Sequence, residues 1–131
     1  QIANMSNEHV EFFTLKGKTI VNIIWPNSNY PDFKTKDGHK YSFIHHQDCC
    51  ESVNLYTTIG NVDDIVGLPI TLAESDHEEP KFASKIKYNE YNESHTWSNF
   101  YLETAKGRLE IYFLGESNGY YSESVDFIKV G

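Results

Sequence analysis

The residues of this chain whose types could do chemistry are concentrated at positions 43–53, which read FIHHQDCCESV. Two histidines, an aspartate, two adjacent cysteines and a glutamate follow one another there. Imidazole, thiol and carboxylate groups can bind a metal ion, transfer a proton or hold a polar ligand. The question of function therefore centres on what this stretch does.

Metal binding is the first chemistry that these residue types allow, with His46, Asp48 and Cys49 as candidate ligands. Zinc accepts imidazole, thiolate and carboxylate ligands in a tetrahedron, but structural zinc sites usually separate their cysteines by two to four residues. His45 and His46 also fall on opposite faces of a strand. A fourth ligand would have to come from His39, His77 or His95. We therefore expect no metal or other cofactor.

Catalysis is the second possibility. A thiolate beside an imidazole is a competent nucleophile, so Cys49 or Cys50 could act with a nearby histidine. His46 with Asp48 or Glu51 could equally act as acid and base in a hydrolysis. Neither pattern is specific, because cysteine is a common small core residue and no helix N-terminus follows the pair. We expect the cysteines to fill core and loop space, and we favour a binding protein over an enzyme.

Ligand binding without chemistry is the third possibility. A second polar turn, at positions 117–123, carries two tyrosines whose rings could stack on a base or a sugar. The two turns together predict one ligand site. Its residues are His45, His46, Asp48, Glu51, Tyr120, Tyr121, Ser122 and Glu123. A structural alternative also fits, in which the first stretch is a bulged crossover held by local hydrogen bonds and the second is a hairpin turn.

The two turns share a short sequence pattern. Glu-Ser-Val followed by Asn or Asp occurs at 51–54 and again at 123–126. Chance explains such an echo in a chain with many serines and glutamates, since short motifs recur without meaning. The alternative is that both segments enter the sheet side by side and line one pocket.

β-Strands are the elements that must position these residues. The chain has 131 residues, 39% hydrophobic and 15% aromatic, which favours a packed sheet over disorder. A chain of this length forms one domain that buries roughly two thirds of its unfolded surface. We expect a single β-rich domain over residues 5–131 and interpret residues 1–4 as the remnant of an expression tag.

Strand-like runs separated by turn signals cover most of the sequence. They occupy 19–25, 32–36, 39–46, 53–59, 69–75, 96–104, 108–115 and 120–129. Asp37-Gly38 predicts a hairpin with a type I′ turn, Asn61 predicts the N-cap of one helical turn, and the last three runs predict an antiparallel meander. The fold class is mainly β, an antiparallel sheet or meander closed as a sandwich or half-barrel, with one or two short helical turns.

The net charge of −8 argues against duplex nucleic acid or a membrane surface as a partner. One basic cluster, Lys81, Lys85 and Lys87, leaves local binding of an anion open. The acidic stretch 74–79 could imitate phosphates for a basic partner but is more typical of a solvated loop. Two adjacent cysteines form no disulfide framework, and the sequence shows no signal peptide or apolar run of about 18 residues. We expect a reducing, cytoplasmic setting.

Two blocks, FIHHQDCCESV with the following VDDIVGLPITLAE and the terminal GESNGYYSESVDF, occur together in a family of small, uncharacterised proteins of tailed bacteriophages and prophages. The chain resembles this family over residues 18–129. The matching positions are His46, Asp48, Cys49, Cys50, Glu51, Ser52, Val53, Trp97 and 115–127. The resemblance implies a protein that acts in the cytoplasm of an infected bacterium, and implies no catalytic activity.

Small phage proteins that are neither virion parts nor replication enzymes often act against host defence. From this association we expect an anti-defence protein that binds and sequesters a nucleotide-derived bacterial immune signal, a sponge. Two alternatives are an acidic inhibitor that binds a host defence protein directly and a hydrolase that degrades the signal. Because sponge sites commonly form between subunits, we also expect a homo-oligomer.

Overall fold

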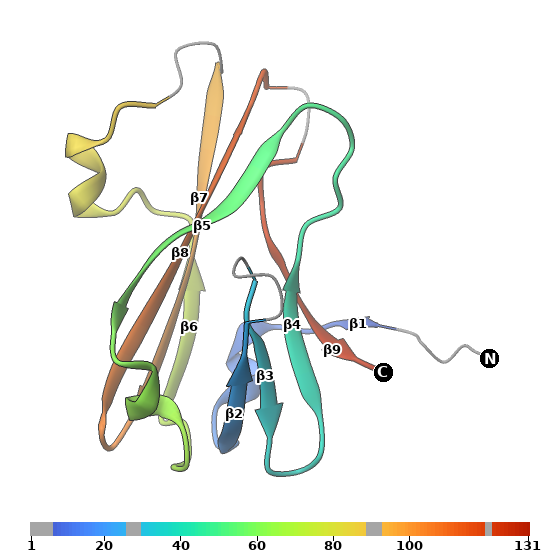
Figure 1. The fold of residues 1–131 in the computed structure, drawn as a ribbon, viewed down its shortest axis with the longest axis vertical. Coiled ribbons are helices and arrows are strands. Elements are labelled where there is room, and N and C mark those ends of the chain that lie inside the picture. The colour runs from blue at the N-terminus through green and yellow to red at the C-terminus, as the bar shows by residue number, and fades with distance from the viewer. Residues whose placement is uncertain (1–6, 26–29, 89–92, 120–121) are drawn as a thin grey trace.

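Two antiparallel β-sheets face each other across one core (Figure 1). The computed structural model describes residues 7–25, 30–88, 93–119 and 122–131. In spatial order the first sheet contains β1 (Glu8–His9), β9 (Asp126–Val130), β4 (Lys40–Ile44), β3 (Asp32–Thr35) and β2 (Ile20–Ile24). The second contains β5 (Ser52–Gly60), β8 (Gly107–Ser117), β7 (Ser94–Thr104) and β6 (Leu72–Asp76).

The helical structure is limited to short 3₁₀ turns. These are η1 (Phe12–Leu15), η2 (Val62–Ile65) and η3 (Lys81–Lys85). Nowhere in the described ranges is there a helix long and apolar enough to cross a membrane. The predicted mainly β, antiparallel fold is confirmed, in its sandwich form.

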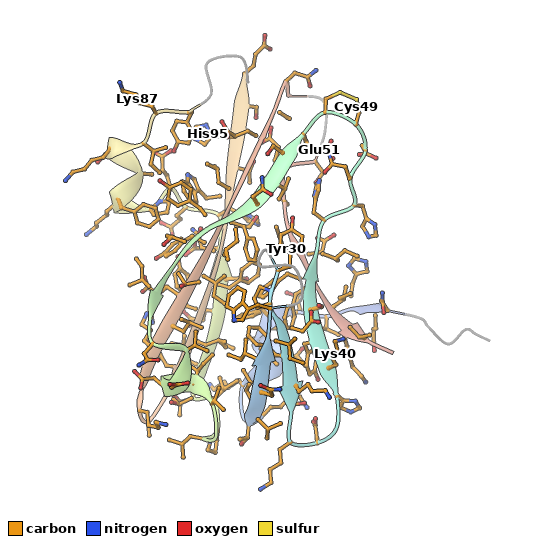
Figure 2. All side chains as sticks on the ribbon, viewed as in Figure 1. Tyr30, Lys40, Cys49, Glu51, Lys87 and His95 are labelled. Carbon is orange, nitrogen blue, oxygen red and sulfur yellow. A yellow bond between two sulfur atoms is a disulfide. The ribbon has the colours of Figure 1, made fainter. Side chains whose placement is uncertain are left out.

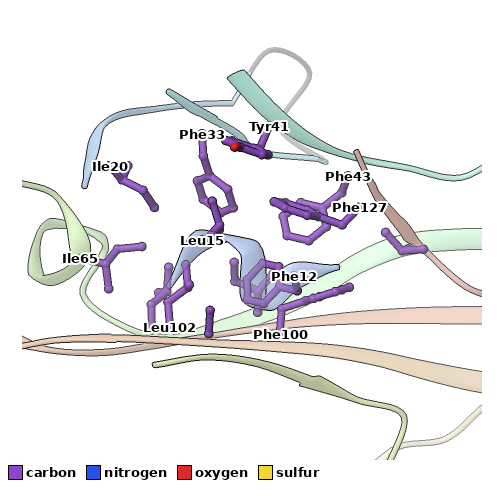
Figure 3. Close-up of a cluster of buried hydrophobic side chains, with 14 of the residues drawn as sticks. Phe12, Leu15, Ile20, Phe33, Tyr41, Phe43, Ile65, Phe100, Leu102 and Phe127 are labelled. Atoms are coloured by element: carbon purple, nitrogen blue, oxygen red, sulfur yellow. The ribbon is translucent and has the colours of Figure 1, made fainter. Parts of the chain in front are cut away.

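An aromatic core fills the space between the sheets (Figure 3). Phe43 of β4 lies at its centre, with its ring centroid 4.7–6.1 Å from those of five other phenylalanines, Phe12, Phe33, Phe100, Phe113 and Phe127. η1 inserts Phe12 and Leu15 between the two layers. Such tilted ring pairs stabilise a core beyond the area they bury.

The turn signals place two short elements correctly. β3 and β4 form the predicted hairpin, and Asn61 caps η2 by accepting the Asp63 N–H at 2.9 Å. The predicted type I′ turn is wrong, because Gly38 N donates to Thr35 O at 3.0 Å and the turn therefore closes one residue earlier. The Asp37 carboxylate fixes this longer loop by accepting the Thr35 hydroxyl and the Lys18 ammonium.

The predicted meander is only half correct. β7 and β8 pair along their whole length, but β9 pairs with β4 and β1 in the other sheet. The predicted third strand of the meander does not pair with β8, because the segment 122–125 crosses from the second sheet to the first. During this crossing the Val125 N–H donates to Ser98 Oγ of β7 at 3.3 Å. The chain then continues into the first sheet, so the two sheets are joined at this end.

The outer face of the second sheet is covered by residues 77–88, which we call the strap (yellow in Figure 1). The strap contains η3 and buries Ala83 with Phe82 against Trp97 and Tyr112. Nδ1 of His77 lies 2.8 Å from Trp97 O, and Asn99 Nδ2 donates to Glu78 O at 2.7 Å. Phe82 and Ala83 of η3 are strap residues that pack on the sheet.

Candidate functional site

The loop formed by residues 45–51 is organised around the carboxylate of Glu51, whose side chain is fully buried. The carboxylate accepts the backbone N–H groups of Asp48 at 2.9 Å and Cys49 at 3.0 Å. These bonds, the one from Asp48 above all, lower the pKa of Glu51 to about 2, and a bond from His45 adds to the effect. The loop thus contains the local hydrogen bonds that the structural alternative expects.

His45 connects this loop to the C-terminal segment. Its Nε2 lies 2.9 Å from the Glu51 carboxylate and its Nδ1 lies 2.9 Å from the carbonyl oxygen of Ser124. Both neighbours only accept hydrogen bonds, so both contacts are satisfied when both ring nitrogens carry a proton. The side chain is only 4% exposed. His45 is therefore a buried residue whose two ring nitrogens link the two turns.

Glu123 is a second buried carboxylate. It accepts the hydroxyls of Thr96 at 2.8 Å and Ser94 at 3.1 Å, and that of Ser117. The two Glu-Ser-Val segments therefore have more in common than sequence, since each buries its glutamate and its valine. They enter different sheets, through β5 and β9, and are joined by His45.

We expect the buried charge of Glu51 to make stability fall in acid. The unfolded carboxyl titrates near 4.5 and the folded one near 2, so the ionised form contributes stability at neutral pH that declines as the pH falls through this window. A Glu51→Gln variant should unfold at lower urea concentration than the wild type at pH 7, and the difference should shrink from about pH 5 to about pH 2. A difference that does not change with pH would contradict this role of the charge.

Replacing Glu123 with glutamine should lower the free energy of unfolding by about 2–4 kcal/mol, because each hydrogen bond to a charged acceptor contributes about 1.5–3 kcal/mol. The amide nitrogen of glutamine would also face hydroxyl donors. Urea unfolding of this variant should be compared with Ser122→Ala, which changes an exposed neighbour. Equal midpoints for the two variants would show that the bonds of Glu123 contribute little.

The other predicted site residues are placed differently. His46, Asp48 and Ser122 are exposed, so their role in ligand binding stays a prediction. Tyr120 and Tyr121 lie outside the described residues. In the part of the chain that the structure describes, no three His, Cys, Asp or Glu side chains are grouped to hold a metal ion.

The two cysteines differ from the expectation that they fill core and loop space. Cys49 and Cys50 are joined by a disulfide bond with an S–S distance of 2.06 Å, and both residues are exposed. The Glu51 carboxylate accepts the Cys49 N–H and so fixes a turn at this point. This turn leaves both cysteine side chains at the surface instead of in the core. The sulfur of Cys49 is bonded to that of Cys50, so the candidate metal set of His46, Asp48 and Cys49 is not assembled.

A pocket of about 230 Å³ opens where this loop leads into β5. Its floor is the outer face of β5 and β8, where Ser52 lies opposite Glu116 and Asn54 lies opposite Leu114. The strap supplies the remaining wall through Ile86, Lys87 and Tyr88, and Leu55 and Tyr56 complete the lining. Figure 2 shows Lys87 at the same end of the molecule as Glu51.

Tyr56 gives the pocket an aromatic surface. Its ring stacks on that of Phe82 at 5.9 Å with 10° between the planes, and meets Trp97 edge-on at 5.3 Å. The residue is nevertheless 47% exposed. No local sequence signal marks Tyr56, because its aromatic partners Phe82 and Trp97 are distant in the sequence.

The strap wall is held to the sheet by a small polar network. Tyr88 stacks on His95 at 3.9 Å, and its hydroxyl accepts the Trp97 indole N–H at 3.2 Å. Glu79 binds His95 Nε2 at 3.1 Å and accepts the Tyr88 hydroxyl at 3.0 Å. The bond from His95 is the main cause of the lowered pKa of Glu79. The pocket therefore has a fixed wall.

The fold and the site together define an antiparallel β-sandwich with a mixed polar and aromatic pocket on its outer face. Residues 14–127 match the sequence model of the family described as Domain of unknown function (DUF7448), and the chain belongs to this family. No curated protein and no solved structure matches the chain. The resemblance to phage proteins stays a prediction.

Proposed function

We propose that this chain binds and sequesters a nucleotide-derived signal without cleaving it. The observation that carries the proposal is the pocket beside the loop, which combines the ring of Tyr56, the cation of Lys87 and the polar floor around Ser52. A nucleotide combines a planar base, which stacks on aromatic rings, with an anionic group that needs a cation. The pocket offers both kinds of contact.

The placement of the candidate acid and base groups favours binding over hydrolysis. Glu51 is fully buried and its carboxylate is used by two backbone N–H groups and by His45. A general base must reach the proton that it removes. His46 and Asp48 are exposed on the loop. Glu51, which the hydrolase alternative would pair with His46, is buried and hydrogen-bonded within the loop.

The biological setting of the proposal rests on the resemblance to phage and prophage proteins. In that setting the chain is an anti-defence protein in the cytoplasm of the infected bacterium, and a second copy that packs over the pocket would deepen it. Direct inhibition of a host defence protein is the alternative. This alternative would use the acidic stretch 74–79. In that stretch the carboxylate of Asp76 accepts hydrogen bonds from Asn99 and Tyr101 of β7, so it is already engaged within the protein.

Thermal unfolding in the presence of candidate ligands tests the proposal. A ligand at about 100 times its dissociation constant adds about 2.7 kcal/mol of stability, which raises the melting temperature by several degrees. Nucleoside phosphates, cyclic dinucleotides and ADP-ribose derivatives form the panel. A rise with at least one of them is expected. No rise with any of them at millimolar concentration would contradict the proposal and favour a protein partner.

A further inference from the structure

The disulfide between Cys49 and Cys50 is a reactive group that the proposed function does not use. These are the two cysteines of the chain, and both residues are exposed on the loop 45–51. Figure 2 shows Cys49 at one end of the molecule. A disulfide at the surface can be reached by the thiol of another molecule, which is the first requirement for thiol–disulfide exchange.

This bond contributes little to holding the fold together. In the chain-entropy description, a disulfide stabilises a protein by closing a loop of the unfolded chain, and the effect grows with the length of that loop. Cys49 and Cys50 are neighbours in the sequence, so their bond closes the shortest loop possible and joins no two strands. Its presence is therefore not explained by a role as a structural cross-link.

Other contacts fix the loop around the bond. The Glu51 carboxylate accepts the N–H groups of Asp48 and Cys49. The side-chain amide of Gln47 donates to the carbonyl oxygens of Glu51 at 2.7 Å and of Cys49 at 3.3 Å. None of these hydrogen bonds involves a sulfur atom, so each can persist when the disulfide opens. The two thiols would then stay close enough to form the bond again.

Reduction by a dithiol breaks and forms bonds in two steps. One thiolate of the dithiol attacks a sulfur of the Cys49–Cys50 bond, so that a mixed disulfide forms and the other cysteine leaves as a thiolate and takes up a proton. The second thiol of the dithiol loses its proton, attacks the mixed disulfide and displaces the remaining cysteine, which is protonated in turn. The chain gains two electrons and two protons, and the dithiol becomes a disulfide.

We propose that Cys49 and Cys50 form a reversible redox site, which takes two electrons from a dithiol and returns them to a disulfide while the fold stays intact. In the cytoplasm of most bacteria, disulfides are usually transient and serve catalysis or redox sensing. The site goes beyond the proposed function and does not depend on the ligand of the pocket.

The return reaction follows from the adjacency of the two cysteines. When glutathione disulfide oxidises the reduced chain, a thiolate of one cysteine attacks it, forms a mixed disulfide with glutathione and releases a second glutathione as a thiol. The neighbouring thiol can then attack this mixed disulfide and displace the bound glutathione, as a resolving cysteine does. The wild type should therefore recover its internal bond and keep no glutathione.

Alkylation with iodoacetamide tests the reduction. Wild type oxidised with glutathione disulfide should take up no label, and after dithiothreitol it should be labelled at both cysteines without denaturant. Its melting temperature should fall by no more than about 5 °C on reduction, because the bond closes a minimal loop. A double variant, Cys49→Ser with Cys50→Ser, should take up no label and melt with the reduced wild type. Labelling only in urea, or a larger fall in melting temperature, would overturn the proposal.

Mass spectrometry after oxidation tests the return reaction. Reduced wild type mixed with glutathione disulfide should carry the internal disulfide and no glutathione. Cys50→Ser lacks the resolving thiol and should keep one glutathione on Cys49, and melting curves confirm that this variant is folded. Equal amounts of bound glutathione on the two proteins would show that the cysteines do not act as a pair, and would overturn the proposal.

Discussion

Replacing Phe43 with alanine should lower the free energy of unfolding by about 3–5 kcal/mol, the usual cost of removing a buried phenylalanine ring. Phe43 is 3% exposed and lies at the centre of the core, where it contacts rings from both sheets and from η1. The neighbours that would have to move into the cavity are themselves held by other rings. Urea unfolding at neutral pH measures the loss.

The matched control is Phe13→Ala. Phe13 is the next residue after Phe12 in η1 but is 64% exposed, so its removal should change stability by no more than about 0.5 kcal/mol. Both variants lose the same side chain, and the comparison isolates burial. Similar losses for the two would contradict the central place of Phe43 in the core.

Gly115→Ala should be nearly as damaging, with a loss of about 3 kcal/mol or more, at the upper end for overpacking. A Cβ atom at this position would overlap the carbonyl oxygen of Glu123 and lie 2.8 Å from its carbonyl carbon. These are backbone atoms of the segment that crosses between the sheets, so they cannot move away without disturbing the hydrogen bonds of Glu123. Thermal and urea unfolding of the variant give the loss.

Gly17→Ala provides the comparison for this substitution. Gly17 has a φ of 88° and an added Cβ meets nothing within 4 Å, so the strain of the left-handed backbone alone should cost about 1–2 kcal/mol. A loss for Gly115→Ala no larger than this would show that the crossing segment yields easily. The close approach at Gly115 would then not determine the route of the chain.

The strands and the short turns could be predicted because their signals are local. Alternating side chains and turn residues located β7 and β8 within a few residues, and Asn61 marked the start of η2. The partner of β9 could not be predicted in this way. It depends on the approach of residues 122–125 to Gly115 and Ser98, which are distant in the sequence.

The site was harder to predict than the fold, and the reasons are specific. Carboxylates are normally exposed, so Glu51 and Glu123 suggested ligand contacts, whereas both are buried and bonded within the protein. Only the assembled structure shows which hydrogen-bond donors surround them. The basic cluster on the strap was visible in the sequence, but the sequence does not show that Lys87 of this cluster lines a pocket with Tyr56, because the strap and β5 are separated in the chain.

A mass balance measures whether the chain holds a nucleotide-derived ligand intact, as we propose. The pure protein is mixed with each candidate nucleotide and filtered, and the retained material is heated and analysed by chromatography. We predict that one nucleotide disappears from the filtrate and returns unchanged in full amount after heating. Its return as cleavage products, or the passage of every candidate through the filter, would contradict the claim.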